Sequence, residues 1–357
     1  MPAVVAVQID IDGRPRPDLV RGLEISIEQD FLRADVAHLT WSGRRDLVDD
    51  PDLDPEARRR LRISLAYGQG VPVPTTLFEG HIARLGADFG ADAVRVRATA
   101  YDDSLRLRQT VAPRSWANTS LASIVAEIAR AHDLEPEIIA EGDYDASRIV
   151  FGYIAKKDET DWQFLIRHAL LRGFEVHVRP GRLIWQPRRL SGQVARRWEY
   201  GGPRHSLRSF APQWSTLQAK RETIVMAWDP EHKRLLVGQS RDLLQQGGRS
   251  LLLRERPVDP DDADRMAEAA RMEAELEAVS GTAEPTEPDA GLVPGILVEV
   301  TGVGRRFSGV YIVAGVSHRI GGSGFRQQAR LQTAVTLGEA IKELGVRVDT
   351  TAEAPAG

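Results

Sequence analysis

The residues with the clearest chemical potential lie in PGILVEVTGVGRRFSGVYIVAGVSHRIGG, residues 294 to 322. This segment holds a Gly-x-Gly at Gly302 and Gly304, a basic pair, and Ser317 beside His318. A phosphate-binding loop needs a helix N-terminus after its glycines, but the β-branched and aromatic run FSGVYIV follows here. Glycines also supply the positive φ angles of strand turns. The segment therefore predicts a β-hairpin.

Ser317 and His318 do not form a nucleophile and its base, because neighbouring residues on a strand point to opposite faces. The sequence also has no G-x-S-x-G elbow. His168 adjoins the apolar face of an expected helix, which is typical of a structural histidine. We assign no catalytic, cofactor-binding or metal-binding residue. The remaining histidines show no metal-ligand spacing: they are His38, His81, His132, His177, His205 and His232.

Acidic residues cluster at 49–54 and 259–264, where a solvated loop and compensation of a helix dipole explain them. A glycosidase pair need not be close in sequence, so a hydrolase stays open as an alternative. The tryptophans are not interleaved with Lys and Arg as in a nucleic-acid stacking groove, and we expect them to serve packing. Six of the seven tryptophans carry this expectation: Trp116, Trp162, Trp185, Trp198, Trp214 and Trp228.

The composition of the 357 residues is that of a soluble globular protein, with 42% hydrophobic and 27% charged residues. A formal net charge of -4 provides no basic field for nucleic acid or an anionic membrane. The absence of cysteine excludes disulfides, thiolate metal sites and cysteine nucleophiles. The N-terminus lacks a signal-peptide pattern, and no apolar run approaches a membrane span, so we expect synthesis in the cytoplasm without membrane insertion.

The periodicity divides the chain into four parts. Strand patterns fill residues 1–110 and return in 201–345, whereas 111–200 mix helices with a hairpin and 346–357 have the composition of a flexible tail. One expected helix has Asp158 as its N-cap and ends at Gly173. Another spans about 260–279. Its small-residue stripe permits close approach of another helix or sheet, or packs on its own domain: Ala263, Met266, Ala267, Ala270, Leu276 and Val279.

Two stretches, KKDETDWQFLIRHALLRGFEVHVRPGRLIW and LVPGILVEVTGVGRRFSGVYIVAGVSHRIGGSGFRQQARLQTA, resemble the hub proteins of contractile tails. This is the phage late-control protein D family, related to the N-terminal hub part of VgrG-type spike proteins. The resemblance covers residues 5 to 340 with weaker stretches. The matching positions are Asp158, Asp161, Trp162, Phe164, Leu165, Gly173, Phe174, Gly181, Pro294, Gly295, Gly309, Tyr311, Val313 and His318.

The resemblance implies an α+β, mainly β fold, with two tail-tube-like antiparallel β-barrels flanking an inserted small α+β domain. It implies a structural, non-enzymatic baseplate hub: a homotrimer of pseudo-sixfold symmetry that adapts the six-fold inner tube to the three-fold spike. The implied partners are the inner tube or a tube-initiator protein, the spike, other baseplate proteins, and a cargo or tape-measure protein in the lumen. No cofactor and no sequence-specific nucleic-acid contact are implied.

The expected destination is a phage tail, a tailocin or an extracellular injection particle. Hub–spike fusions continue into further domains, whereas this sequence ends in TTAEAPAG, so we expect the spike to be a separate polypeptide. The alternatives are a tail-associated cell-wall hydrolase and a carbohydrate-binding tail-tip module. The latter predicts a row of exposed tryptophans along one sheet face.

Overall fold

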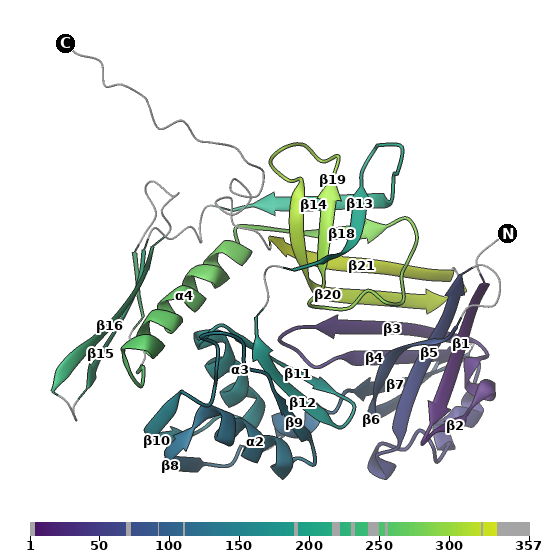
Figure 1. Ribbon diagram of the computed structural model, residues 1–357. Helices are drawn as coiled ribbons and strands as arrows, with labels where there is room; N and C mark the ends of the chain where they lie inside the picture. The colour runs from purple at the N-terminus through teal and green to yellow at the C-terminus, as the bar shows by residue number, and fades with distance from the viewer. Residues whose placement is uncertain are drawn as a thin grey trace.

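The structure is a computed structural model that describes residues 4–68, 73–91, 93–109, 111–188, 192–215, 222–229, 233–241, 250–253, 256–322 and 324–333. The tail expected at 346–357 lies outside these residues. The described chain is mainly β, with one large sheet, three small sheets and few helices (Figure 1). The α+β, mainly β class expected from the sequence is confirmed.

The first β half follows the alternation of its sequence, with every second side chain buried, as at Ile25 and Ile27. Its strands pair antiparallel in the order β3-β4-β7-β6-β5-β1-β2 around one apolar core. Three short 3-10 helices, Pro17–Val20, Arg45–Asp49 and Pro55–Ala57, connect them. The strands are β1 (Val4–Ile11), β2 (Arg14–Pro15), β3 (Leu23–Asp30), β4 (Val36–Ser42), β5 (Arg60–Gly68), β6 (Thr75–Phe89) and β7 (Val94–Tyr101).

The inserted unit has its own core beneath helices α2 and α3. Strands β8 and β10 pair antiparallel, and β11, β12 and β9 form a second small sheet (Figure 1). The hairpin expected around Gly181 is present as β11 and β12. The elements are α1 (Leu105–Gln109), β8 (Arg114–Ser120), α2 (Leu121–Ala131), β9 (Glu135–Ile138), β10 (Val150–Lys156), α3 (Asp161–Leu171), β11 (Phe174–Arg179) and β12 (Arg182–Pro187).

The expected cap of α3 was wrong, because Thr160 rather than Asp158 begins this helix. The Thr160 hydroxyl accepts a hydrogen bond from the Gln163 amide at 3.1 Å, and the Gln163 side chain accepts one from the Thr160 amide at 2.8 Å. This reciprocal capping box satisfies two amides that the helix leaves open. The expected end is confirmed, since Gly173 follows the last turn with a φ of 71°.

The second β half contains the hairpin predicted around Gly302, in which β19 and β20 pair antiparallel. Gly302 has a φ of 80°, and a Cβ there would lie 2.2 Å from the Tyr200 carbonyl oxygen. The elements are β13 (Val194–Glu199), β14 (Leu207–Trp214), β15 (Glu222–Asp229), β16 (Arg234–Arg241), β17 (Ser250–Leu253), α4 (Pro260–Leu276), β18 (Val279–Pro285), β19 (Leu297–Thr301), β20 (Gly309–Gly321) and β21 (Gly324–Thr333).

Part of the expected small-residue stripe packs α4 on its own chain, against β15 and β16. Ala263, Met266 and Ala267 are buried there with Val225. Leu276 packs instead in a cluster with Phe31. The helix ends there, before Val279, which lies on β18. A Cβ on Gly238 would lie 2.0 Å from the backbone carbon of Ala263, so the strand and the helix approach closely because both residues are small.

Strand β20 of the second half pairs antiparallel with β3 of the first, which joins the halves into one 13-stranded sheet. Among the described residues this sheet runs from β14 to β2 without closing into separate barrels. The domain boundaries expected from the sequence stay a prediction. Strand β13, which that division assigns to the insert, pairs with β19 of the second half.

Candidate functional site

The most extensive candidate site is one face of the large sheet, from β14 to the C-terminal half of β6. Along β7, for example, Val96 and Ala98 face the core, while Arg95 and Arg97 are exposed. The register places exposed residues of all the intervening strands on the same side. We call this side the polar face; its exposed charged and amide side chains include Arg326, Gln328, Arg330, Arg319, Glu24, Glu28, Arg95, Arg97, Arg84 and Asp88.

Opposite charges pair across strands on the polar face. Arg330 of β21 lies 2.6 Å from Asp30 of β3, which bridges the two β halves. Arg97 pairs with Asp88 across β7 and β6. His38 of β4 hydrogen-bonds through Nδ1 to the Thr99 hydroxyl of β7 at 3.3 Å. Cross-strand pairs of this kind stabilise the register and leave a surface of mixed charge.

His318 lies on the opposite, buried face, at the seam between the halves. The Gln327 amide donates to its Nδ1 at 3.2 Å, and its Nε2 donates to the Gln29 oxygen at 3.0 Å. Phe325 stacks on its ring with centroids 5.9 Å apart. Burial lowers the pKa of His318 to about 4, so the ring is neutral. Ser317 does not share this environment, which confirms that the two side chains point apart.

Two carboxyl groups meet beside this seam, where β3 and β7 end. The Asp35 carboxylate accepts from the Asp30 amide at 3.2 Å, and the Asp35 amide donates to Asp102 at 3.1 Å. Asp102 also accepts from the Ser104 hydroxyl at 2.5 Å. Burial raises the pKa of both acids, and repulsion from Asp102 helps to raise the pKa of Asp35 to about 7.

A buried ion pair ties the inserted unit to α4. Asp262 accepts hydrogen bonds from Nε and Nη2 of Arg172, both at 2.9 Å, and both side chains are almost fully buried. The expected solvation of residues 259–264 was therefore wrong for Asp262, although this residue does lie in the first turn of α4. His168 accepts from Arg172 at 3.1 Å, and burial and this cation lower the pKa of His168 to about 2. His168 is thus a structural residue, as predicted.

Within the insert, Asp161 likewise pairs with a buried cation. It lies 2.7 Å from the buried Lys156 ammonium and 2.7 Å from Nε2 of His132. These contacts hold the pKa of the Asp161 carboxyl below its usual range even though burial opposes them. Asp161, one of the positions that match the hub family, therefore fixes the start of α3 through its contacts with Lys156 and His132.

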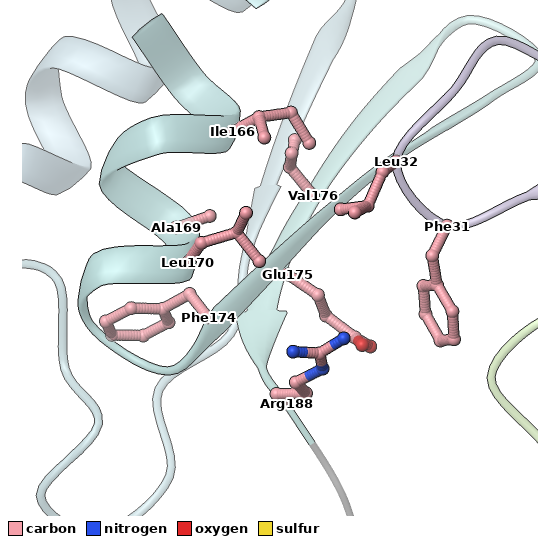
Figure 2. Close-up of a pocket in the computed structure, with 9 residues that line it drawn as sticks. All are labelled: Phe31, Leu32, Ile166, Ala169, Leu170, Phe174, Glu175, Val176 and Arg188. Atoms are coloured by element: carbon pink, nitrogen blue, oxygen red, sulfur yellow. The ribbon is translucent and has the colours of Figure 1, made fainter. Parts of the chain in front are cut away.

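The loop after β3 closes a small cavity against α3 and β11. Phe31 and Leu32 of this loop line the cavity, and Figure 2 shows Leu32 directed toward Leu170 and Val176. The cavity is about 10 Å³, which accommodates no more than a single water. Leu32 also accepts a hydrogen bond from the Trp162 indole at 3.4 Å. This contact joins the insert to the first half rather than forming a ligand site.

Most tryptophans serve packing, as expected: Trp116, Trp162, Trp185 and Trp198 are buried. Trp214 and Trp228 are 52% and 59% exposed, but they belong to different sheets. The described residues therefore contain no row of exposed tryptophans.

Within the described ranges, no group of His, Asp and Glu side chains is arranged to hold a metal ion. None of the helices in these ranges is both long and apolar enough to cross a membrane.

The fold is that of phage tail proteins. The 43 kDa tail protein of prophage MuSo2 from Shewanella oneidensis has a TM-score of 0.69 at 14% identity, covering 92% of this chain and 98% of that one. A tail protein from Neisseria meningitidis MC58 has a TM-score of 0.69 at 17% identity, covering 92% and 96%. The predicted resemblance to the hub proteins is confirmed at the level of the fold.

A third structure with this fold is an E. coli component of the type VI secretion system. Its TM-score is 0.57 at 10% identity, covering 93% of this chain and 76% of that one. The model of the Alg8 N-terminal domain family matches residues 2–322, so the chain belongs to that family. A search of curated proteins finds no match.

Proposed function

We propose that this protein is the structural hub of a contractile tail or injection system, without catalytic activity. Three copies form a ring in which six β halves meet the six-fold inner tube, while the three-fold symmetry matches the spike. The observation that supports this proposal is the continuous sheet, which passes through both halves and has two stretches of strand paired on one side only, at β14 and along the C-terminal half of β6.

The first edge is β14, which among the described strands pairs only with β18. The second is the C-terminal half of β6. Strand β5 covers β6 only between Thr75 and His81, so Ile82–Phe89 pair on one side, with β7. An open edge is a template for another strand. A contact between one edge of a chain and the other edge of its neighbour is heterologous and generates a ring when the rotation closes.

Side chains at both edges favour contact with a neighbour. Phe89 at the end of β6 is 64% exposed, and Trp214 at the end of β14 is 52% exposed. Joining these edges would make the polar face continuous around the inside of the ring. A lumen of mixed charge would let a cargo or tape-measure protein pass without adhering to apolar patches.

The same arrangement leaves the two ends of the ring for the tube or its initiator, the spike and other baseplate proteins. Solved chains with this fold support such partners, since one neighbour is the VgrG–PdpA complex of Francisella, with a TM-score of 0.58 at 8% identity. We propose assembly into a phage tail, tailocin or injection particle.

Native mass spectrometry of edge variants tests this proposal. Phe89→Asp places a charge at the β6 edge and is expected to shift trimers toward monomers, with an unchanged circular dichroism spectrum. Val150→Asp is the matched control, because Val150 is a 50% exposed apolar residue on β10 of the insert. Equal trimer fractions for the two variants, or a wild-type protein that stays monomeric when tube and spike proteins are added, would overturn the proposal.

A further inference from the structure

One row of side chains that crosses the polar face carries positive charge and no carboxylate. The strand register places six side chains directly opposite one another, one from each of six neighbouring strands. Buried neighbours flank the first five along their strands, and Arg84 lies opposite Thr99, so all six share one side of the sheet. We call this set the basic row; from β21 to β6 it is Arg326, Arg319, Ser26, His38, Thr99 and Arg84.

The arginines of the basic row have no counter-charge on their own chain. Two other arginines of the polar face have the carboxylate partners described above, whereas Arg326, Arg319 and Arg84 form no ion pair with any residue that the structure describes. Arg326 and Arg319 even lie directly opposite each other across β21 and β20. Like charges in this position destabilise a sheet, and a bound anion would offset the repulsion.

Two glutamates restrict the kind of anion that fits. Glu24 and Glu28 are exposed on β3, two residues to either side of Ser26, so they border the middle of the basic row. Each nucleotide of a nucleic acid carries a phosphate, and a strand laid along the row would hold a charge between these carboxylates. A polypeptide can place neutral residues there and acidic residues at the two ends, at Arg319 and Arg84. Charge complementarity therefore favours a polypeptide.

The length of the basic row sets the spacing of those acidic residues. Neighbouring strands lie about 4.8 Å apart, so Arg319 and Arg84, four strands apart, are separated by about 19 Å. An extended polypeptide advances about 3.3 Å per residue and covers this distance in about six residues. Between the arginines the row offers two hydroxyls and an imidazole to the backbone of such a segment. His38 and Thr99 already hydrogen-bond each other at 3.3 Å, which fixes their positions.

We propose that the basic row binds an extended acidic segment of a partner polypeptide, which crosses the strands with its carboxylates on the arginines at the two ends. The row is complete on one chain, so its binding does not depend on the ring. Only the position of the bound segment, across the wall of the lumen, rests on the proposed function. Failure of either proposal therefore leaves the test of the other standing.

Fluorescence anisotropy at low ionic strength measures this binding, because salt screens exposed charges. The probe is the fluorescein-labelled peptide EGESGSGSE, and the uncharged QGQSGSGSQ is its control. Arg319→Gln with Arg326→Gln is expected to raise the Kd about five- to tenfold, with an unchanged circular dichroism spectrum. Arg204→Gln with Arg305→Gln is the matched control variant, since both arginines are exposed in loops of the second half.

Three results would overturn the proposal. They are equal Kd values for the two variants, a wild-type protein that does not distinguish EGESGSGSE from its uncharged control, and tighter binding of an oligothymidylate of nine nucleotides. The last result would assign the basic row to nucleic acid.

The spacing of the acidic residues gives a second measurement. The peptide EGESE has the same number of glutamates, but it is too short to reach from Arg319 to Arg84. Arg84→Gln should weaken binding of EGESGSGSE about two- to fivefold and leave binding of EGESE unchanged. An equal effect on both peptides, or no effect on either, would show that the bound segment does not run along the row.

Discussion

Single residues set how firmly the halves and the insert are joined, and Asp35 makes this pH-dependent. Its pKa of about 7 exceeds the ordinary value near 3.9 of the unfolded chain. Between about pH 4 and 7 the folded form keeps a proton that the unfolded form has lost, so stability falls as pH rises through this window.

Asp35→Asn should remove this loss of stability at high pH. The Asn side chain is neutral at every pH, and its oxygen can still accept the hydrogen bond from the Asp30 backbone amide. We expect the variant to be more stable than wild type at pH 8 by about 1–2 kcal/mol, and nearly equal at pH 5. Urea denaturation at both pH values measures this. A variant that is less stable at pH 8 would contradict the assigned protonation state.

For the buried pair of Arg172 and Asp262, we expect that removing one partner destabilises the protein more than replacing both. Asp262→Ala leaves a buried guanidinium without its partner and should cost about 3–5 kcal/mol of unfolding free energy. Arg172→Met combined with Asp262→Leu should recover most of that loss. Glu159→Ala at the exposed pair with Arg167 is the control, with an expected cost below about 1 kcal/mol. A double variant as unstable as Asp262→Ala would contradict this interpretation.

At the scale of elements, the approach of β16 to α4 depends on Gly238. Gly238→Ala should destabilise the protein by about 1–3 kcal/mol, because its Cβ would overlap the Ala263 backbone. Gly152→Ala on β10 is the matched strand control, since its Cβ would meet nothing within 4 Å. Thermal unfolding of both variants measures the difference, and equal midpoints would show that the helix simply moves away.

Helices, turns and hairpins of this chain could be predicted from the sequence where they depend on residues close together in the chain. The hairpin at Gly302, the end of α3 at Gly173 and the α4 stripe follow from a few neighbouring residues. The Asp158 cap failed because Thr160 and Gln163 form a better reciprocal pair two residues later.

Long-range pairing left no comparable signal in the sequence. The contact of Gln29 with His318 spans 289 positions, and that of Asp35 with Asp102 spans 67. Asp262 looked solvated because its partner Arg172 lies 90 positions away. The one available hint of the carboxyl junction was the position of the two acids at strand ends, Asp35 directly before β4 and Asp102 directly after β7.

At the scale of the whole molecule, the proposed ring of three chains depends on the two β halves being joined in one sheet. The β20–β3 seam is built within one chain, with His318, Gln29 and Arg330 crossing it. In the proposed ring, the seams between chains would instead join β14 of one copy to β6 of the next, and a closed assembly would leave neither of these two edges free.

Cross-linking across that seam tests the central claim most directly. Gln213→Cys on β14 and Asp88→Cys on β6, in one cysteine-free background, are treated with a short bismaleimide and separated under denaturing conditions. We predict covalent products that end at three chains, three times the 39.5 kDa of one chain, with neither single-cysteine variant passing two. Products limited to single chains, or a ladder that continues beyond three, would contradict a closed three-fold ring.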